Sequence, residues 1–362
     1  MENHPEYFFE ITYLRAFAIL AVISIHVSGA FSEMSGFTFL TLLYMSLNAF
    51  SRFAVPLFVC MSGFLLYNKY QGSFSLTLFY KNRFLSVVPQ FTIFSIIGIL
   101  FSYFGFRYSG KIWNLSAADI LYRFFTGNAM YHLWFFVLII QLYLLYPIIE
   151  KVLTKSIENN KTHTLLFFLL VVQIICQIFP IQFLDGVVTM FSLYIFYFVL
   201  GMYVRLNYSD FKKRIITFKH SYIFLLALLF STTLGIGSLN IDYLKNNLVP
   251  QFINLLFEVV KPFYYILVFI LLLYLALKIS EIIPNIMTKF LQKIGNYSFG
   301  IYLIHAFILY ALIQVLFPRL GFDMNNWLFY PITFMLVLSL SLTFVFLISK
   351  FPYHEYIIGS LR

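Results

Sequence analysis

The chain has 362 residues, of which 61% are hydrophobic and only 10% are charged. A soluble domain usually carries about 25% charged residues, so this composition excludes a water-soluble globular enzyme and favours a protein embedded in lipid. The net charge of +10 does not indicate nucleic-acid binding, because the basic residues lie between apolar runs, where they set the orientation of membrane helices.

Apolar runs long enough to cross a bilayer recur along the whole sequence. A bilayer core of about 30 Å needs about 20 mostly apolar residues per helix. The sequence therefore predicts an all-α polytopic membrane protein that forms one domain over residues 1–362, with no soluble domain. About ten transmembrane helices are expected, near residues 11–31, 47–67, 84–105, 131–150, 164–180, 187–206, 221–238, 260–279, 297–317 and 327–350.

The helix expected at residues 47–67 leaves alternatives open. Apolar residues begin at Phe37, so a longer tilted helix also fits. Helices broken at Pro56 and Pro147 fit as well, because membrane helices tolerate proline where neighbouring groups satisfy the freed backbone. The first apolar run has no small-residue cleavage pattern, so it is expected to remain as an uncleaved helix.

The distribution of lysine and arginine predicts the orientation. With the N-terminus inside, sixteen of these residues fall in the inner loops and the C-terminal tail, and six fall in the outer loops. Cytoplasmic loops carry such an excess, so both termini are predicted to be cytoplasmic.

Ionisable residues inside apolar runs are rare, costly and usually functional. Arg15 and His26 lie in the first run and are eleven residues apart, which is three helical turns plus about 20°, so both face one side at about 16 Å separation. Ala18 and Val22 line the stripe between them, whereas Ser24 points elsewhere. A cation and a titratable imidazole joined by a small apolar track suit an elongated ligand with an anionic head and a reactive tail.

Four other ionisable residues lie inside the apolar runs or at their ends. They are Arg52, Arg83, His132 and His305, with Tyr302 one turn before His305 as its expected hydrogen-bond partner. These residues also have interpretations without function. Arg15 could extend to the inner lipid headgroups, and His26 and His305 could serve only in packing. No serine nucleophile elbow, P-loop, dinucleotide fingerprint or HExxH motif is present, so any chemistry is expected to be histidine-based and metal-free.

Five segments in order resemble the bacterial membrane acyltransferase family 3, as a short stand-alone form. They are YLRAFAILAVISIHVSGAF (13–31), FAVPLFVCMSGFLL (53–66), YKNRFLSVVP (80–89), HLWFF (132–136) and NYSFGIYLIH (296–305). The first motif helix is 11–31 and the last is 297–317. The basic turn departs from the family pattern, because the position three residues after Arg83 is Ser86 rather than a second arginine.

The resemblance implies a multi-pass enzyme of the bacterial plasma membrane, in contact with lipid. It implies transfer of an acetyl or succinyl group from a cytoplasmic acyl-CoA donor to a hydroxyl of a cell-surface carbohydrate or exopolysaccharide. No permanently bound cofactor is expected. The main alternative is a transporter or flippase for a saccharide or anion, against which no inverted repeat is evident.

Each candidate residue has an expected role in acyl transfer, stated here as a hypothesis. His26 is expected to act as a catalytic base or acyl carrier, and Arg52 to stabilise the developing oxyanion. Arg15, Arg83 and Lys81 are expected to hold the anionic part of the donor. His132 and Trp134 are expected to contact the sugar, and Glu258 is the candidate carboxylate that orients His26.

Overall fold

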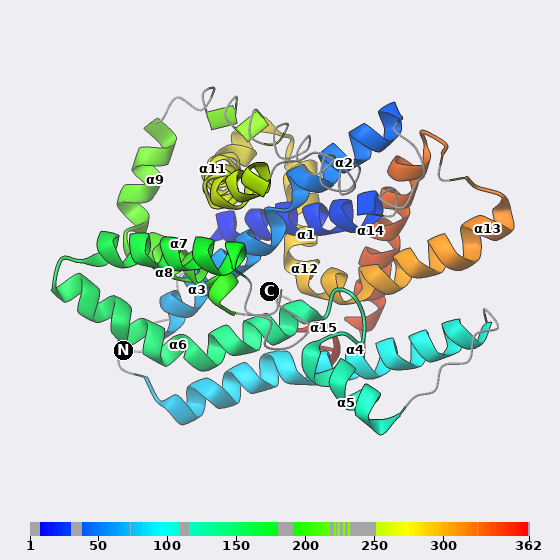
Figure 1. The fold of residues 1–362 in the computed structure, drawn as a ribbon, viewed down its shortest axis with the longest axis horizontal. Coiled ribbons are helices and arrows are strands. Elements are labelled where there is room, and N and C mark those ends of the chain that lie inside the picture. Colours follow the sequence, from blue (N-terminus) through cyan, green and yellow to red (C-terminus); the bar gives the residue numbers. More distant parts are fainter. Residues whose placement is uncertain are drawn as a thin grey trace. The chain divides into compact units, whose positions relative to one another are not determined.

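The computed structural model describes residues 8–29, 38–72, 74–108, 116–179, 191–217, 251–323 and 325–360, with short helical pieces between 221 and 231. All regular elements in these ranges are helices, as predicted (Figure 1). The first half of the chain contains α1 (Phe9–Gly29), α2 (Phe39–Ser51), α3 (Ala54–Tyr70), α4 (Leu76–Tyr108), α5 (Ala117–Thr126), α6 (Trp134–Glu158) and α7 (Thr162–Ile178). The second half contains η3 (Phe191–Leu193), α8 (Ile195–Leu206), α9 (Tyr208–Thr217), α11 (Gln251–Ile282), α12 (Asn285–Ala311), η4 (Leu312–Leu316), α13 (Phe317–Leu320), α14 (Phe329–Ile348) and α15 (Glu355–Ile358).

Seven of the described helical segments are long and apolar enough to cross a membrane, which makes the chain a multi-pass membrane protein by length and composition. They are Phe9–Gly29, Phe39–Tyr70, Leu76–Phe104, Trp134–Glu158, Leu255–Ile282, Asn285–Leu320 and Phe329–Ile348. Two further predicted helices correspond to the shorter apolar helices α7 and α8. Most of the helix predicted at 221–238 lies outside the described residues, so the total of ten stays a prediction.

Proline acts differently at its two suspected break positions. The α2–α3 segment is interrupted at Arg52 and Phe53, which lie in a turn. Pro56 stands in the first turn of α3, and because it has no N–H it cannot continue the helical hydrogen bonds back to Arg52. Pro147 lies inside α6, which continues unbroken from Trp134 to Glu158.

The chain forms two compact units, which are described separately. The first comprises Met1–Lys69 and Leu200–Phe344, and the second comprises Tyr70–Val199 and Val345–Arg362. In the first unit, α1 is buried on nearly every side, as expected for a helix that is apolar all round. In the second unit, α4 packs against α5, α6 and α15, and the Gln90 amide donates a hydrogen bond of 2.6 Å to the Glu355 carbonyl.

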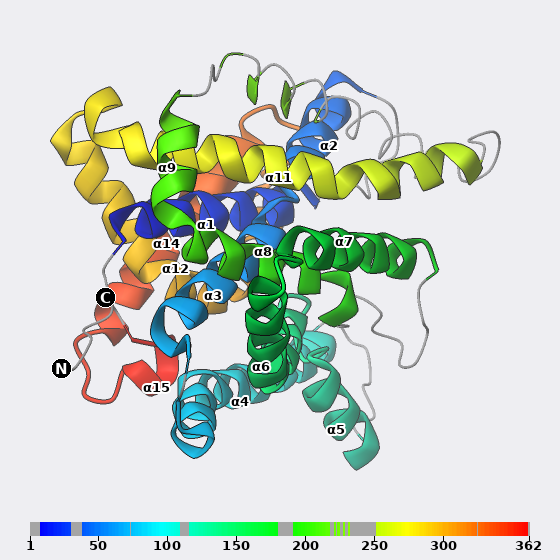
Figure 2. The same ribbon diagram turned by 90° about the vertical axis from the view of Figure 1, so that its left-hand side faces the viewer.

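The most extensive helix pairing in the first unit joins α1 to α12 (Figures 1 and 2). Gly295 lies against Thr12, and a Cβ atom at Gly295 would sit 2.0 Å from the Thr12 carbonyl oxygen. Three residues further along both helices, Arg15 meets Ser298. Residue numbers rise together along the interface, so the two helices run parallel, and only glycine permits so close an approach of their backbones.

We predict that Gly295→Ala destabilises the protein by about 1–3 kcal/mol or prevents folding, because backbone rather than a flexible side chain opposes the added methyl group. Thermal unfolding of the detergent-solubilised protein measures this. Gly29→Ala is the matched control, since the nearest atom to its added Cβ would be 3.8 Å away. Equal melting temperatures for the two variants would contradict the close approach.

Candidate active site

Helix α1 places Arg15 and His26 as their spacing predicts, because it is continuous from Phe9 to Gly29. Both side chains meet residues of α12. The Arg15 Nε donates a hydrogen bond of 3.2 Å to the Ser298 hydroxyl. The His26 ring lies against the His305 ring, with a centroid separation of 5.3 Å and an angle of 34° between the planes.

The tautomer of His305 follows from its hydrogen bonds. Its Nδ1 lies 2.7 Å from the Tyr302 carbonyl oxygen and 3.2 Å from that of Ile301. Carbonyl oxygens only accept hydrogen bonds, so Nδ1 carries the proton and Nε2 presents a lone pair. Tyr302 is thus a partner of His305 through its carbonyl, whereas the sequence suggested its side chain; the two rings lie 5.8 Å apart.

The two imidazoles form an electrostatically coupled pair. At 5.3 Å, two imidazolium charges would repel by about 3 kcal/mol at an effective dielectric constant near 20. His305 is fully buried, which adds a desolvation cost to any charge there. The pair therefore favours at most one bound proton, an arrangement that can accept and return a proton during a reaction.

A hydrogen-bonded network holds the helix segment that carries His26. The Ser24 hydroxyl lies 2.8 Å from the Tyr330 hydroxyl of α14 and accepts a bond of 2.9 Å from Ser51 of α2. The Asn48 amide donates to the Ile25 carbonyl at 2.8 Å. The helical spacing predicts that Ser24 points away from the His26 face. It does not reveal these partners, which come from the next helix, α2, and from α14, which is distant in sequence.

Arg52 lies at the α2–α3 break and is exposed. Its Nε donates a hydrogen bond of 3.2 Å to Asn48 Oδ1, so it is connected through Asn48 to the backbone of α1 beside His26. An arginine in the middle of a membrane segment normally faces the protein interior or a water-filled cavity. Its predicted role toward an oxyanion stays a prediction.

Glu258, on α11, forms an ion pair with Lys261 one turn further along the helix. The role of Glu258 in orienting His26 stays a prediction.

Four of the predicted site residues belong to the second unit. The Arg83 guanidinium lies over the rings of Tyr70 and Tyr143, 5.6 and 5.9 Å from their centroids. Lys81 is exposed. His132 is buried in the turn before α6, and the Trp134 ring lies 6.1 Å from that of Tyr194.

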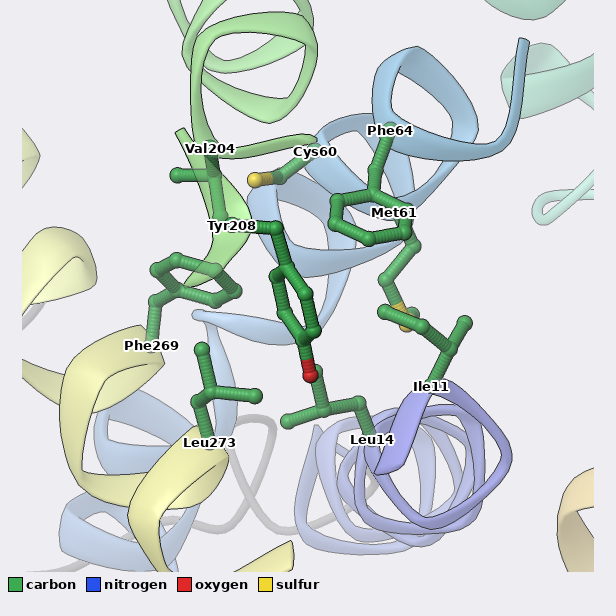
Figure 3. A pocket seen from close by; sticks show the side chains of 9 residues that line it. All are labelled: Ile11, Leu14, Cys60, Met61, Phe64, Val204, Tyr208, Phe269 and Leu273. Atoms are coloured by element: carbon green, nitrogen blue, oxygen red, sulfur yellow. The ribbon is translucent and has the colours of Figure 1, made fainter. Parts of the chain in front are cut away.

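An apolar crevice lies beside the first turns of α1, and the ring of Tyr208 projects into it (Figure 3). The lining residues are Ile11, Leu14, Cys60, Met61, Phe64, Val204, Tyr208, Phe269 and Leu273. Its free space is about 10 Å³, which is the room that one water molecule needs. The Tyr208 hydroxyl donates a hydrogen bond to Glu10, and the other lining side chains are apolar apart from the buried thiol of Cys60.

These features define a multi-pass membrane protein whose first unit carries a histidine pair and an arginine along one helix interface. The sequence profile described as an acyltransferase domain matches residues 8–346. The chain therefore belongs to acyltransferase family 3, as its motifs indicated, and this membership supports acyl transfer in general.

Two similar sequences from Staphylococcus epidermidis are each named "Probable poly-beta-1,6-N-acetyl-D-glucosamine export protein". Each is 25% identical to this chain over 372 residues, an alignment that covers 97% of this chain and 94% of the relative. No solved structure matches the chain.

We predict that Ser24 and Tyr330 are energetically coupled. A double-mutant cycle with Ser24→Ala and Tyr330→Phe is expected to give an interaction free energy of about 1 kcal/mol, because removing either hydroxyl leaves the other without that bond. Thermal unfolding measures it. Ser339→Ala, which removes an exposed hydroxyl from the same helix, serves with Ser24→Ala as the uncoupled control cycle; equal coupling in both cycles would contradict the network.

Proposed function

We propose that this protein transfers an acetyl or succinyl group from an acyl-CoA donor to a hydroxyl of a cell-surface carbohydrate. The observation that carries the proposal is the α1–α12 interface, where Arg15 and the His26–His305 pair lie on one face of α1. Family membership supports acyl transfer, and the polysaccharide in the relatives' name supports a carbohydrate acceptor.

In this proposal Arg15 holds a phosphate of the donor, and the thioester extends along α1 to His26. A guanidinium is suited to this role because its planar fork matches a phosphate group. Ser298 fixes the orientation of the Arg15 side chain through its hydrogen bond. Arg83 and Lys81 of the second unit are proposed as further donor-binding residues.

His26 then removes the proton from the acceptor hydroxyl as its oxygen attacks the thioester carbonyl. A carbon–oxygen bond forms, the carbon–sulfur bond breaks, and the proton passes from the imidazolium to the departing thiolate. His305 supports the transient charge through the lone pair of its Nε2. In the variant of this mechanism with His26 as acyl carrier, the imidazole nitrogen attacks the thioester carbonyl and displaces the thiolate. The acceptor hydroxyl then attacks the acyl-imidazole, the carbon–nitrogen bond breaks, and the hydroxyl proton passes to the thiolate.

The remaining predicted residues take supporting roles. Arg52 is proposed to stabilise the oxyanion and Glu258 to orient His26, while His132 and Trp134 contact the saccharide. Ten membrane-spanning helices with both termini in the cytoplasm, in a bacterial plasma membrane, complete the proposal. The excess of lysine and arginine in the inner loops supports this orientation.

Export of a saccharide is the second candidate function, favoured by the name of the Staphylococcus relatives. Buried arginine and histidine serve substrate pathways as well as catalysis. Vesicles containing the purified protein distinguish the two functions. Movement of a labelled oligosaccharide without consumption of acyl-CoA would favour export.

We predict that His26→Ala lowers acyl-CoA turnover by at least about 100-fold while the donor still binds, because general base catalysis contributes about 10²–10⁴-fold. His305→Gln is expected to lower it by a smaller factor, about tenfold. Thiol release by the purified protein in nanodiscs measures turnover, and His163→Ala, which alters an exposed histidine, is the control. Full turnover by His26→Ala would refute a catalytic role for this residue.

We predict that Arg15→Ala weakens binding of acyl-CoA by about tenfold or more, since hydrogen bonds to charged groups contribute about 1.5–3 kcal/mol. Ser298→Ala is expected to weaken it less, because the cation remains. Calorimetric titration with acyl-CoA measures both. Arg319→Ala removes an exposed cation of the same unit, and a similar loss in that control would mean that only overall charge matters.

A further inference from the structure

Ser95 stands in the middle of α4 with a side chain that is 0% exposed. Its hydroxyl has no hydrogen-bond partner among the residues that the structure describes. Serine in a helix usually satisfies its hydroxyl on a carbonyl of the preceding turn. A buried polar group without a partner is costly and calls for an explanation.

The contacts on either side of Ser95 fix what it faces. Phe91, one turn earlier, stacks on Phe136 with a centroid separation of 5.6 Å. Gly98, one turn later, lies so close to Ala129 that a Cβ there would be 2.8 Å from the Ala129 carbonyl oxygen. The two contacts are seven residues apart on α4 and seven residues apart on the facing segment. Residue numbers increase in opposite directions along the two segments.

This register places His132 opposite Ser95. Ser95 is four residues after Phe91, and His132 is four residues before Phe136, so both occupy the same level of the interface. Hydrogen bonds from Leu133 to Met130, from Phe135 to His132 and from Phe136 to Leu133 fold residues 130–136 into consecutive turns. His132 is 1% exposed, so the serine and the histidine are both enclosed in the second unit.

Aromatic side chains surround the part of the interface that contains Ser95 and His132. Phe91 also lies 5.3 Å from Phe124 of α5, and the ring of His132 lies 5.7 Å from that of Tyr131. Tyr131 is 46% exposed and therefore reaches the surface beside the buried histidine. Neutral hydrogen-bonding groups among aromatic rings suit a neutral hydroxylated ligand better than an anion.

We infer that Ser95 and His132 form a polar pair that binds a hydroxyl group of the saccharide acceptor. A sugar hydroxyl both donates and accepts, so it can bond to a serine hydroxyl and an imidazole nitrogen together. The assignment of the ligand as the acceptor rests on the proposed function. In the proposed topology the pair lies in the outer half of the membrane, the side from which a cell-surface carbohydrate arrives.

The pairing is tested by Ser95→Cys in a Cys60→Ala, Cys176→Ala background. An imidazole beside a thiol can accept its proton, which raises the thiolate fraction at neutral pH. Alkylation by iodoacetamide at pH 7 is expected to be about tenfold faster than in the same protein with His132→Gln. Ser341→Cys, at another fully buried serine without a hydrogen-bond partner in the described residues, is the matched control and should not respond to His132→Gln.

The ligand is tested by adding an oligosaccharide of β-1,6-linked N-acetylglucosamine during alkylation. Slower alkylation of Ser95→Cys, with no change at Ser341→Cys, supports a saccharide site. Equal alkylation with and without His132 would overturn the pairing, and alkylation unaffected by the saccharide would overturn the ligand. If the saccharide slows alkylation of Ser95→Cys but the wild-type protein does not turn over acyl-CoA, the proposed reaction is refuted and the saccharide site remains supported.

Discussion

The close approach of α1 and α12 at Gly295 is the constraint on which the candidate active site depends. A Cβ atom at this position would overlap the Thr12 carbonyl oxygen, so the helix backbones are nearly in contact there. That contact sets the register in which Arg15 meets Ser298 and His26 meets His305. A one-residue shift of α12 would rotate His305 away by about 100° and separate the two rings.

The site is rigid for reasons that lie outside the histidines themselves. His305 is fixed by carbonyl groups of its own helix, and the segment that carries His26 is bonded to α2 and α14 through Ser24 and Asn48. Inside a membrane such bonds also satisfy polar groups that lipid cannot hydrate. Stability and preorganisation of the site therefore arise from the same hydrogen bonds.

The sequence predicted the face of α1 that carries Arg15 and His26, because eleven residues make about three full turns in a continuous helix and return to the same face. A break near Pro56 was one of the alternatives that the sequence left open, whereas the break considered at Pro147 is absent because α6 continues through it. The partners on α12 were not predictable from spacing, since interhelical register depends on packing. The short helix α5 was missed, although Ser116 and Asp119 form a capping box at its start whose S-x-x-D pattern is visible in the sequence. The proposed pairing of Ser95 with His132 depends on contacts between α4 and the turn before α6, which no periodicity reveals.

The most direct test of the central claim is a structure of the protein with a non-hydrolysable thioether analogue of acyl-CoA. The account predicts a phosphate of the analogue at Arg15 and its acyl end beside His26, with the acyl carbonyl carbon within about 3.5 Å of a nitrogen of the His26 imidazole. An analogue bound with its acyl end remote from both histidines would contradict the account.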